Sequence, residues 1–145
     1  MKESNSKNVA CHKPHVVVTA FILRDGKVLV GKRIGSIGSG TWCIPGGRMK
    51  FGEELHECAK REILEETGLK IKNLRLGTVV NNYSIRDRWH YTSICYIADY
   101  ASGNVRVMEP DRCLEWRWVK WNNLPKPLFA PMKTMIKQGF DPFKK

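Results

Sequence analysis

The sequence lacks any long apolar run. None of its apolar stretches approaches the roughly 20 residues that a membrane-spanning helix needs, so no contact with a membrane is expected. The N-terminus carries no apolar signal segment, and the five cysteines are odd in number and form no Cys-X-X-Cys pair. These absences argue against a secreted protein held together by disulfides. We therefore expect a cytoplasmic protein with reduced thiols.

Acidic residues are scarce. The chain has 14 Asp and Glu against 25 Lys and Arg, which gives a formal net charge of +11. Six of those 14 acids nevertheless fall between Glu53 and Glu66. Carboxylates gathered in an otherwise basic protein suggest a site for a divalent metal ion, and such a site suggests phosphate chemistry.

The chain has the length and apolar content of one domain. Residues 1–14 are polar and irregular and are expected to form a loose tail, which leaves residues 15–145 as a single domain. Asp25-Gly26 predicts a hairpin turn. Apolar and β-rich runs predict strands over 16–23, 28–31, 41–44, 91–100 and 114–121, with another strand ending at 79–80. Together with a short C-terminal helix over 132–137, this pattern indicates an α+β fold.

The acidic segment itself is predicted to be a helix. From Glu54 to Glu66 it contains no Pro or Gly, and Gly68 follows as a helix terminator. At about 100° per residue, Glu62 and Glu66 project into the middle of an apolar stripe, and Glu65 lies at its edge. The residues of that stripe are Leu55, Cys58, Ala59 and Ile63.

Two carboxylates one turn apart on an inward face repel each other and lose hydration. Without compensation, at least one would have its pKa raised and stay protonated. A bound Mg²⁺ or Mn²⁺ removes that cost, because hard cations favour clustered oxygen ligands. The alternative is a solvated acidic face with ordinary ion pairs, which the position of the acids on the apolar side disfavours. Arg61 lies off this face and could reach back to Glu53, tying the preceding loop to the helix.

The motif is similar to that of a known family. The spacing from Gly47 through Glu53 to the run Arg61–Leu69 resembles the Nudix box at every defining position, over 23 residues. The resemblance implies a Nudix fold, with a mixed β-sheet sandwiched between helices. It also implies hydrolysis of a nucleoside diphosphate linked to another moiety, with Mg²⁺ or Mn²⁺ held by the loop and helix.

The resemblance also implies roles for single residues. Glu62 and Glu66 would be the main metal ligands, and Glu65 would be a further ligand or the base for the attacking water. Glu53 would act through a metal-bound water or through its pairing with Arg61. A backbone carbonyl, at Gly46 or Gly47, would complete the coordination.

Other candidate residues are assigned from their chemistry. The basic residues Arg33, Arg48 and Lys50 could meet phosphate oxygens, although each is also an ordinary surface charge. A base pocket could use amide and aromatic side chains, which read base edges and stack on base faces. Its candidates are Asn81, Asn82, Trp89, His90, Trp116 and Trp118, with core packing an equal alternative for the last two. Glu109 resembles an extra acid that some relatives place near the metals; a turn residue before Pro110 is the alternative.

The resemblance extends from about Val16 to Phe143 and is strongest to MutT-type nucleotide diphosphatases, of the eukaryotic Nudix-15 and plant cytosolic Nudix-1 types. It implies cleavage of (d)NTPs, including oxidised or modified ones, to the monophosphate and pyrophosphate. Some plant members hydrolyse prenyl diphosphates instead. No proline follows Leu69 near the position where ADP-ribose hydrolases carry one, and this favours a mononucleotide.

Two other functions stay open. The basic charge could serve an enzyme that acts on an RNA 5′ triphosphate or cap, but Lys and Arg are spread along the chain and no RNA-binding module is recognisable. A non-enzymatic nucleotide-binding module is disfavoured because the acids of the motif are all present. We therefore expect a small-molecule nucleotide substrate before nucleic acid, and, from the resemblance, a possible homodimer.

Overall fold

The computed structural model describes residues 13–35 and 37–144 and has an α+β fold, as expected from the sequence. Residues 1–12 of the predicted tail lie outside the described residues. Within the described residues, no helix is both long and apolar enough to cross a membrane. The elements, in chain order, are β1 (His15–Arg24), β2 (Lys27–Arg33), β3 (Trp42–Cys43), β4 (Gly46–Arg48), α2 (Leu55–Thr67), β5 (Lys70–Ser84), β6 (Trp89–Ser102), β7 (Cys113–Lys120), the 3₁₀ turn η1 (Trp121–Asn123) and α3 (Ala130–Lys137).

The predicted hairpin joins β1 to β2. Asp25 and Gly26 both have positive φ, 50° and 78°, which is the geometry of a two-residue turn that matches strand twist. Only the strand ends next to this turn pair, Leu23 with Val28 and Arg24 with Lys27. The two strands then diverge.

That divergence splits the sheet. β1 pairs along nearly its whole length with β6, in parallel, while its first half also pairs with the short strand β4. β2 instead pairs with β3 and β7. The sheet is therefore closed near the hairpin and open at the other end, between the β2–β3–β7 strands and the β4–β1–β6 strands.

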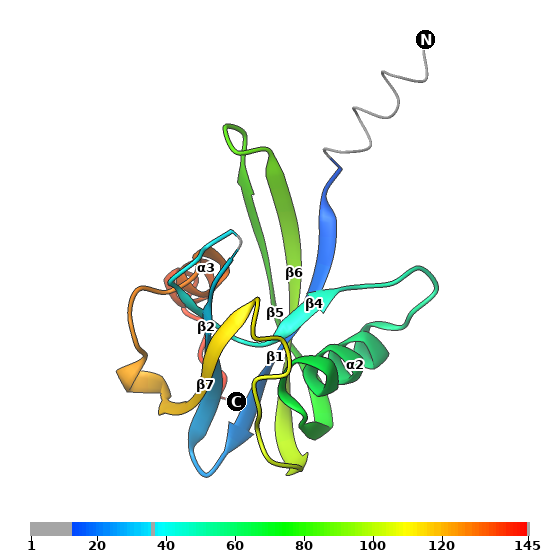
Figure 1. Ribbon diagram of the computed structural model, residues 1–145, viewed down its shortest axis with the longest axis vertical. Helices are drawn as coiled ribbons and strands as arrows, with labels where there is room; N and C mark the ends of the chain where they lie inside the picture. The colour runs from blue at the N-terminus through cyan, green and yellow to red at the C-terminus, as the bar shows by residue number, and fades with distance from the viewer. Residues whose placement is uncertain (1–12, 36, 145) are drawn as a thin grey trace.

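The two described helices lie on opposite faces of β1, so the sheet is sandwiched between helices as predicted (Figure 1). Alternation along β1 explains why both faces are apolar. Ala20 and Ile22 pack in one cluster with Ile63 of α2. Phe21 packs in another cluster with Met132 and Met135 of α3. The opening between the strands therefore has one helix on each side.

One predicted boundary was wrong. β5 does not end at Val80 but continues to Ser84, in a long hairpin with β6 (Figure 1). Asn81 and Asn82 have low β-propensity, so the sequence indicated a strand end there. Pairing of these residues with Thr92 and Tyr91 overrides that propensity.

Candidate active site

Helix α2 carries the acidic motif, and its ends are set by local chemistry. Glu54 is the N-cap and forms a reciprocal capping box with Glu57, whose carboxylate accepts a hydrogen bond from the Glu54 N–H at 3.1 Å. Gly68 ends the helix in the left-handed conformation, with φ of 78°. Cys58, Ala59 and Ile63 are buried, which confirms the predicted helix and most of its apolar stripe.

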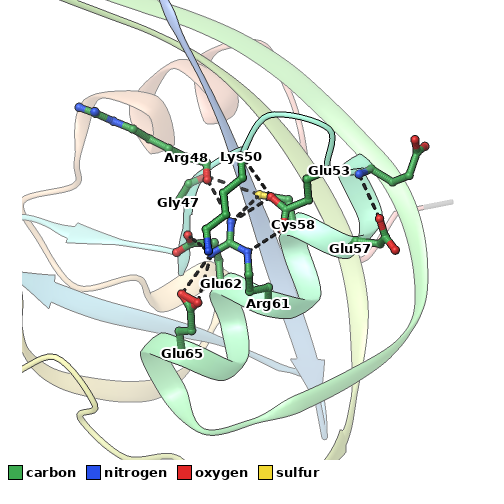
Figure 2. A network of polar contacts seen from close by, with 10 residues as sticks. Gly47, Arg48, Lys50, Glu53, Glu57, Cys58, Arg61, Glu62 and Glu65 are labelled. Carbon is green, nitrogen blue, oxygen red and sulfur yellow. Dashed lines mark hydrogen bonds and ion pairs between the residues drawn. The ribbon is translucent and has the colours of Figure 1, made fainter.

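Arg61 is the hub of an ion-pair network (Figure 2). It binds Glu53 through two hydrogen bonds, Nε to Oε2 at 2.6 Å and Nη2 to Oε1 at 3.0 Å, so the predicted link between loop and helix is present. Its Nη1 also donates to Glu62 at 2.8 Å and to Glu65 at 3.1 Å. Hydrogen bonds from Arg61 and from the backbone N–H of Lys50 lower the pKa of Glu53 to about 2. The network fixes the loop against α2.

Glu66 lies in a different environment from the acids that Arg61 holds. Its Oε1 accepts a hydrogen bond from the Gly46 N–H at 2.9 Å. Burial, together with the smaller effects of the charges of Glu62 and Glu109, raises the pKa of Glu66 to about 8 against this hydrogen bond. Burial is also the main cause that raises the pKa of Glu62. The charge of Glu109 thus acts on both Glu62 and Glu66, the two carboxylates whose ionised forms burial disfavours.

Gly47 allows the Glu62 carboxylate to approach the backbone of β4. A Cβ on Gly47 would overlap the carboxylate group of Glu62. We therefore expect Gly47→Ala to push Glu62 out of place and to lower kcat by about 10-fold or more, because misplaced catalytic groups are costly. Steady-state kinetics at saturating Mg²⁺ would test this, with a thermal melt to show that the variant is folded. Unchanged kcat in a folded variant would contradict a need for this close approach.

A cavity of about 650 Å³ opens beside these carboxylates, where the sheet splits. Of the residues predicted for the site, it is lined by Arg33, Gly46, Gly47, Arg48, Glu62, Glu66, Asn82, Trp89, Glu109 and Trp116. The structure thus brings two of the box acids, Glu109, two arginines and part of the predicted base pocket to one cavity. The side chains of Glu53, Arg61 and Glu65 lie outside its lining, in the Arg61 network.

Three residues predicted for the base pocket, Asn81, His90 and Trp118, lie outside the lining of the main cavity. Asn81 is exposed, and its Oδ1 accepts a hydrogen bond from Thr92 Oγ1 at 2.9 Å and lies 2.7 Å from His90 Nε2. Asn81 and Asn82 are neighbours on one strand, so only one of them can face the cavity. Trp118 packs edge-on against Tyr100, with ring centroids 6.3 Å apart. Trp118 is therefore a packing residue, which was the alternative to a role in the base pocket. Trp116 lines the cavity, and its Nε1 donates a hydrogen bond to the Glu66 carbonyl at 3.3 Å.

Sequence reasoning missed the part of the cavity wall that α3 and its preceding loop supply. Phe129, Met132 and Met135 line it, and Arg33 lies over the Phe129 ring at 4.0 Å. These residues lie more than 60 positions after the acidic motif, and their apolar spacing indicates only an amphipathic helix. No local signal could have placed them beside the carboxylates.

The donor set fits a divalent metal ion. Among residues 13–35 and 37–144, no three acidic, His or Cys side chains come together closely enough to hold a metal ion as they stand, and Arg61 binds Glu62 and Glu65. Glu62, Glu66 and Glu109 line one cavity and carry the oxygen donors that Mg²⁺ or Mn²⁺ requires, and the repulsion between their charges is what such an ion would relieve. Glu62 and Glu66 would hold the ion, with Glu109 or a Glu65 released from Arg61 as a third ligand.

Comparisons with known proteins agree with this geometry. The NUDIX domain family matches residues 13–139. An ADP-ribose pyrophosphatase from Methanocaldococcus jannaschii is 39% identical over an alignment of 127 residues that covers 84% of this chain and 71% of that protein. The NAD-capped RNA hydrolase NudC from Shigella dysenteriae is 31% identical over an alignment of 115 residues that covers 77% of this chain but only 40% of that longer protein.

A solved structure shows the same fold. The crystal structure of a MutT NUDIX hydrolase from Burkholderia pseudomallei superposes with a TM-score of 0.82 at 33% identity, and the match covers 87% of this chain and 98% of that one. The predicted mixed sheet between helices is thus confirmed as a Nudix fold. The chain belongs to the NUDIX family and is a MutT-like Nudix hydrolase.

Proposed function

We propose that this protein cleaves nucleoside triphosphates, including oxidised or otherwise modified (d)NTPs, to the monophosphate and pyrophosphate in the presence of Mg²⁺ or Mn²⁺. The observation that carries the proposal is a single cavity that joins the crowded carboxylates to an amide- and aromatic-lined wall. Its volume of about 650 Å³ falls within the range of small-molecule sites. A triphosphate next to the carboxylates would leave the base against Asn82, Trp116 and the α3 side chains.

The bound cation, the arginines and the glutamates would have different roles, which follow from their charges. When bound, the cation would neutralise the phosphate oxygens and orient the attacking water. Arg33 and Arg48 line the same cavity and would offset the remaining phosphate charge. Glu66 faces the cavity whereas Glu65 pairs with Arg61, so Glu66 is the better placed of the two to accept a proton. Arg61 would position Glu62 rather than contact the substrate.

A second candidate function rests on a second, smaller pocket. This pocket of about 230 Å³ shares Arg48, Trp89 and Tyr91 with the main cavity. Its other lining residues include His15, whose ring lies 5.7 Å from that of Tyr91, and the cations Lys13 and Arg88. Aromatic rings among cations suit a further ring or nucleotide beyond the diphosphate. This favours substrates of the kind named for the curated relatives, ADP-ribose or a capped RNA 5′ end, as the second candidate.

A substrate panel tests both candidates. Purified protein with Mg²⁺ would be incubated with normal and oxidised (d)NTPs, ADP-ribose, triphosphate-ended and NAD-capped RNA, and geranyl diphosphate, and the products identified by mass spectrometry. We expect monophosphate and pyrophosphate from (d)NTPs, complete loss of turnover with EDTA and recovery with added Mg²⁺. Cleavage of ADP-ribose or RNA alone would move the assignment to the second candidate, and turnover that resists EDTA would contradict the metal site. Light scattering on the same sample tests the expected homodimer.

A further inference from the structure

The smaller pocket beside the main cavity is lined by three aromatic rings that contact one another. Trp89 and Tyr91 of β6 have ring centroids 6.0 Å apart, and the ring of His15, on the neighbouring strand β1, lies 5.7 Å from that of Tyr91. All three residues are half-buried, so part of each ring is accessible to a ligand. We call this space of about 230 Å³ the aromatic pocket.

Positive charge surrounds these rings. Within the part of the chain that the structure describes, the cations Lys13, Arg48 and Arg88 line the aromatic pocket, against the single acid Asp87. Asp87 is already paired, because Arg86 Nε donates a hydrogen bond to its Oδ1 at 3.1 Å. The three cations come from distant parts of the sequence, and the fold brings them together. Such a pocket favours a ligand that has both an aromatic ring and a negative charge.

Arg48 marks the junction of the aromatic pocket and the main cavity, because it lines both. Its side chain extends away from the Arg61 network (Figure 2), and its Nη2 donates a hydrogen bond to Tyr91 Oη at 3.0 Å. Its backbone carbonyl accepts a hydrogen bond from Arg61 Nη2 at 3.2 Å. The guanidinium group is thus held at the junction before a ligand binds. A ligand that spans both spaces passes this group, which favours a phosphate at that point.

The chemistry of the aromatic pocket separates the ligands that could span both spaces. The second half of ADP-ribose is a sugar, which has no aromatic face to stack and adds no phosphate beyond the diphosphate. The nicotinamide ring of an NAD cap is aromatic but carries a positive charge, which the three cations disfavour. The second nucleotide of a single strand supplies both an unpaired base for the rings and a phosphodiester for the cations. The pocket therefore fits a single strand best.

We propose that this protein binds the 5′ end of a single-stranded polynucleotide. The first nucleotide occupies the main cavity, the phosphodiester that follows it lies at Arg48, and the second base stacks in the aromatic pocket. The inference rests on the proposed nucleotide site in the main cavity and extends that site beyond one nucleotide. The aromatic pocket contributes binding contacts and no reacting group, so the inference is independent of which bond the enzyme cleaves.

Calorimetry with three ligands of increasing length tests the proposal. The ligands are AMP, adenosine 3′,5′-bisphosphate, which adds the phosphate, and the 5′-phosphorylated dinucleotide pApA, which adds the second base. We expect each step to raise affinity, and the second step to raise it about 5- to 100-fold, as one stacked base does. The logarithm of the affinity for pApA should also fall more steeply with the logarithm of the salt concentration, by about 0.7 for the added phosphate. Equal affinities for all three ligands, or a gain from the phosphate alone, would overturn the proposal.

Variants locate the gain in the aromatic pocket. Arg88→Met should weaken binding of pApA and leave that of AMP within about 2-fold, because Arg88 lines only the aromatic pocket. Arg75→Met is the matched control, since it removes an exposed cation that lines neither space, and it should change neither affinity. Tyr91→Leu should abolish the gain that the second base gives. A gain that survived both Tyr91→Leu and Arg88→Met would place the second nucleotide elsewhere and overturn the proposal.

A second ring variant keeps the test decisive if Tyr91→Leu fails to fold. Trp89→Leu, at the start of β6, should also reduce the ratio of the affinities for pApA and AMP. The deoxyadenosine series, measured in the same way, identifies the strand: equal gains indicate RNA or DNA, and a gain with the ribose series alone indicates RNA. None of these ligands contains a pyrophosphate bond, so binding is read without turnover. A silent substrate panel with tight binding of pApA would reject the proposed reaction alone, whereas active cleavage with equal binding of AMP and pApA would reject this inference alone.

Discussion

Replacing Glu66 with Gln is expected to lower kcat at saturating Mg²⁺ by about 10²–10³-fold, the scale on which loss of one preorganised charge slows an enzyme. Glu66 is the carboxylate with the strongest case for metal binding, because it faces the cavity, is largely buried and has its pKa raised to about 8. Gln keeps the shape and can still accept the Gly46 N–H, so the backbone around the site should be preserved. The charge alone is removed.

The same substitution should not reduce stability in the absence of metal. Glu66 has its folded-state pKa raised from 4.5 to about 8, so over that pH range the unfolded chain releases a proton that the folded chain retains. The contribution of Glu66 to the free energy of unfolding therefore decreases as pH rises from about 4.5 to 8. Glu66→Gln removes this pH dependence of the free energy of unfolding. In the wild type, Mg²⁺ should offset the same dependence by favouring the ionised form of Glu66.

Denaturant unfolding at several pH values, with and without Mg²⁺, measures these effects beside kcat. Glu57→Gln is the matched control on the same helix, because Gln can keep the capping box and the residue lies away from the cavity. The control should leave both kcat and the pH slope unchanged. Near-normal kcat for Glu66→Gln would remove Glu66 from the metal site.

The acidic motif could be predicted from the sequence because its geometry is local. The order of residues on a helix follows from the 3.6-residue period, so the shared face of Glu62 and Glu66 could be computed by counting. Arg61 and Glu53 are only eight positions apart, separated by the N-cap and the first turns of α2, so their pairing at 2.6 Å could be predicted in the same way. The family resemblance then supplied the chemistry.

The base pocket could not be predicted because it depends on long-range register. The pairing of β5 with β6 shifts between Lys70 and Ile71, between Lys72 and Arg75, and between Leu76 and Thr78, and each irregularity can change which face a later residue takes. Counting along the sequence therefore could not decide whether Asn81 or Asn82 faces the cavity.

A different cause explains why Trp116 lines the cavity and Trp118 does not. Both lie on the same side of β7 by strand alternation, and both pack near the same apolar cluster. Only Trp116 reaches the point where the sheet splits, opposite Gly31, whose lack of a side chain leaves room for the indole. The position of the opening depends on how far β1 and β2 stay paired, which is a property of the whole sheet.

The second large effect is expected from Arg61→Met. Arg61 is the shared counter-charge of Glu53, Glu62 and Glu65, so its loss leaves three neighbouring carboxylates to repel one another. Breaking a buried ion pair from one side costs about 3–5 kcal/mol. Because 21% of the Arg61 side chain is exposed, solvent weakens its ion pairs. We therefore expect Arg61→Met to lower the free energy of unfolding by an amount in the lower part of the range of about 2–4 kcal/mol. kcat should also fall, since Glu62 loses the group that orients it.

Mg²⁺ distinguishes this electrostatic origin from a simple loss of packing. The carboxylates that Arg61 releases are hard oxygen ligands, so added Mg²⁺ should stabilise Arg61→Met more than it stabilises the wild type. The free energy of unfolding of Arg61→Lys should lie between those of Arg61→Met and the wild type. An ammonium group keeps the positive charge but cannot reproduce the two hydrogen bonds to Glu53. Arg75→Met, which removes an exposed pair with Asp99, should cost at most about 1 kcal/mol. If Mg²⁺ stabilised Arg61→Met and the wild type equally, the carboxylates would not be the cause, and the account of Arg61 as their shared counter-charge would fail.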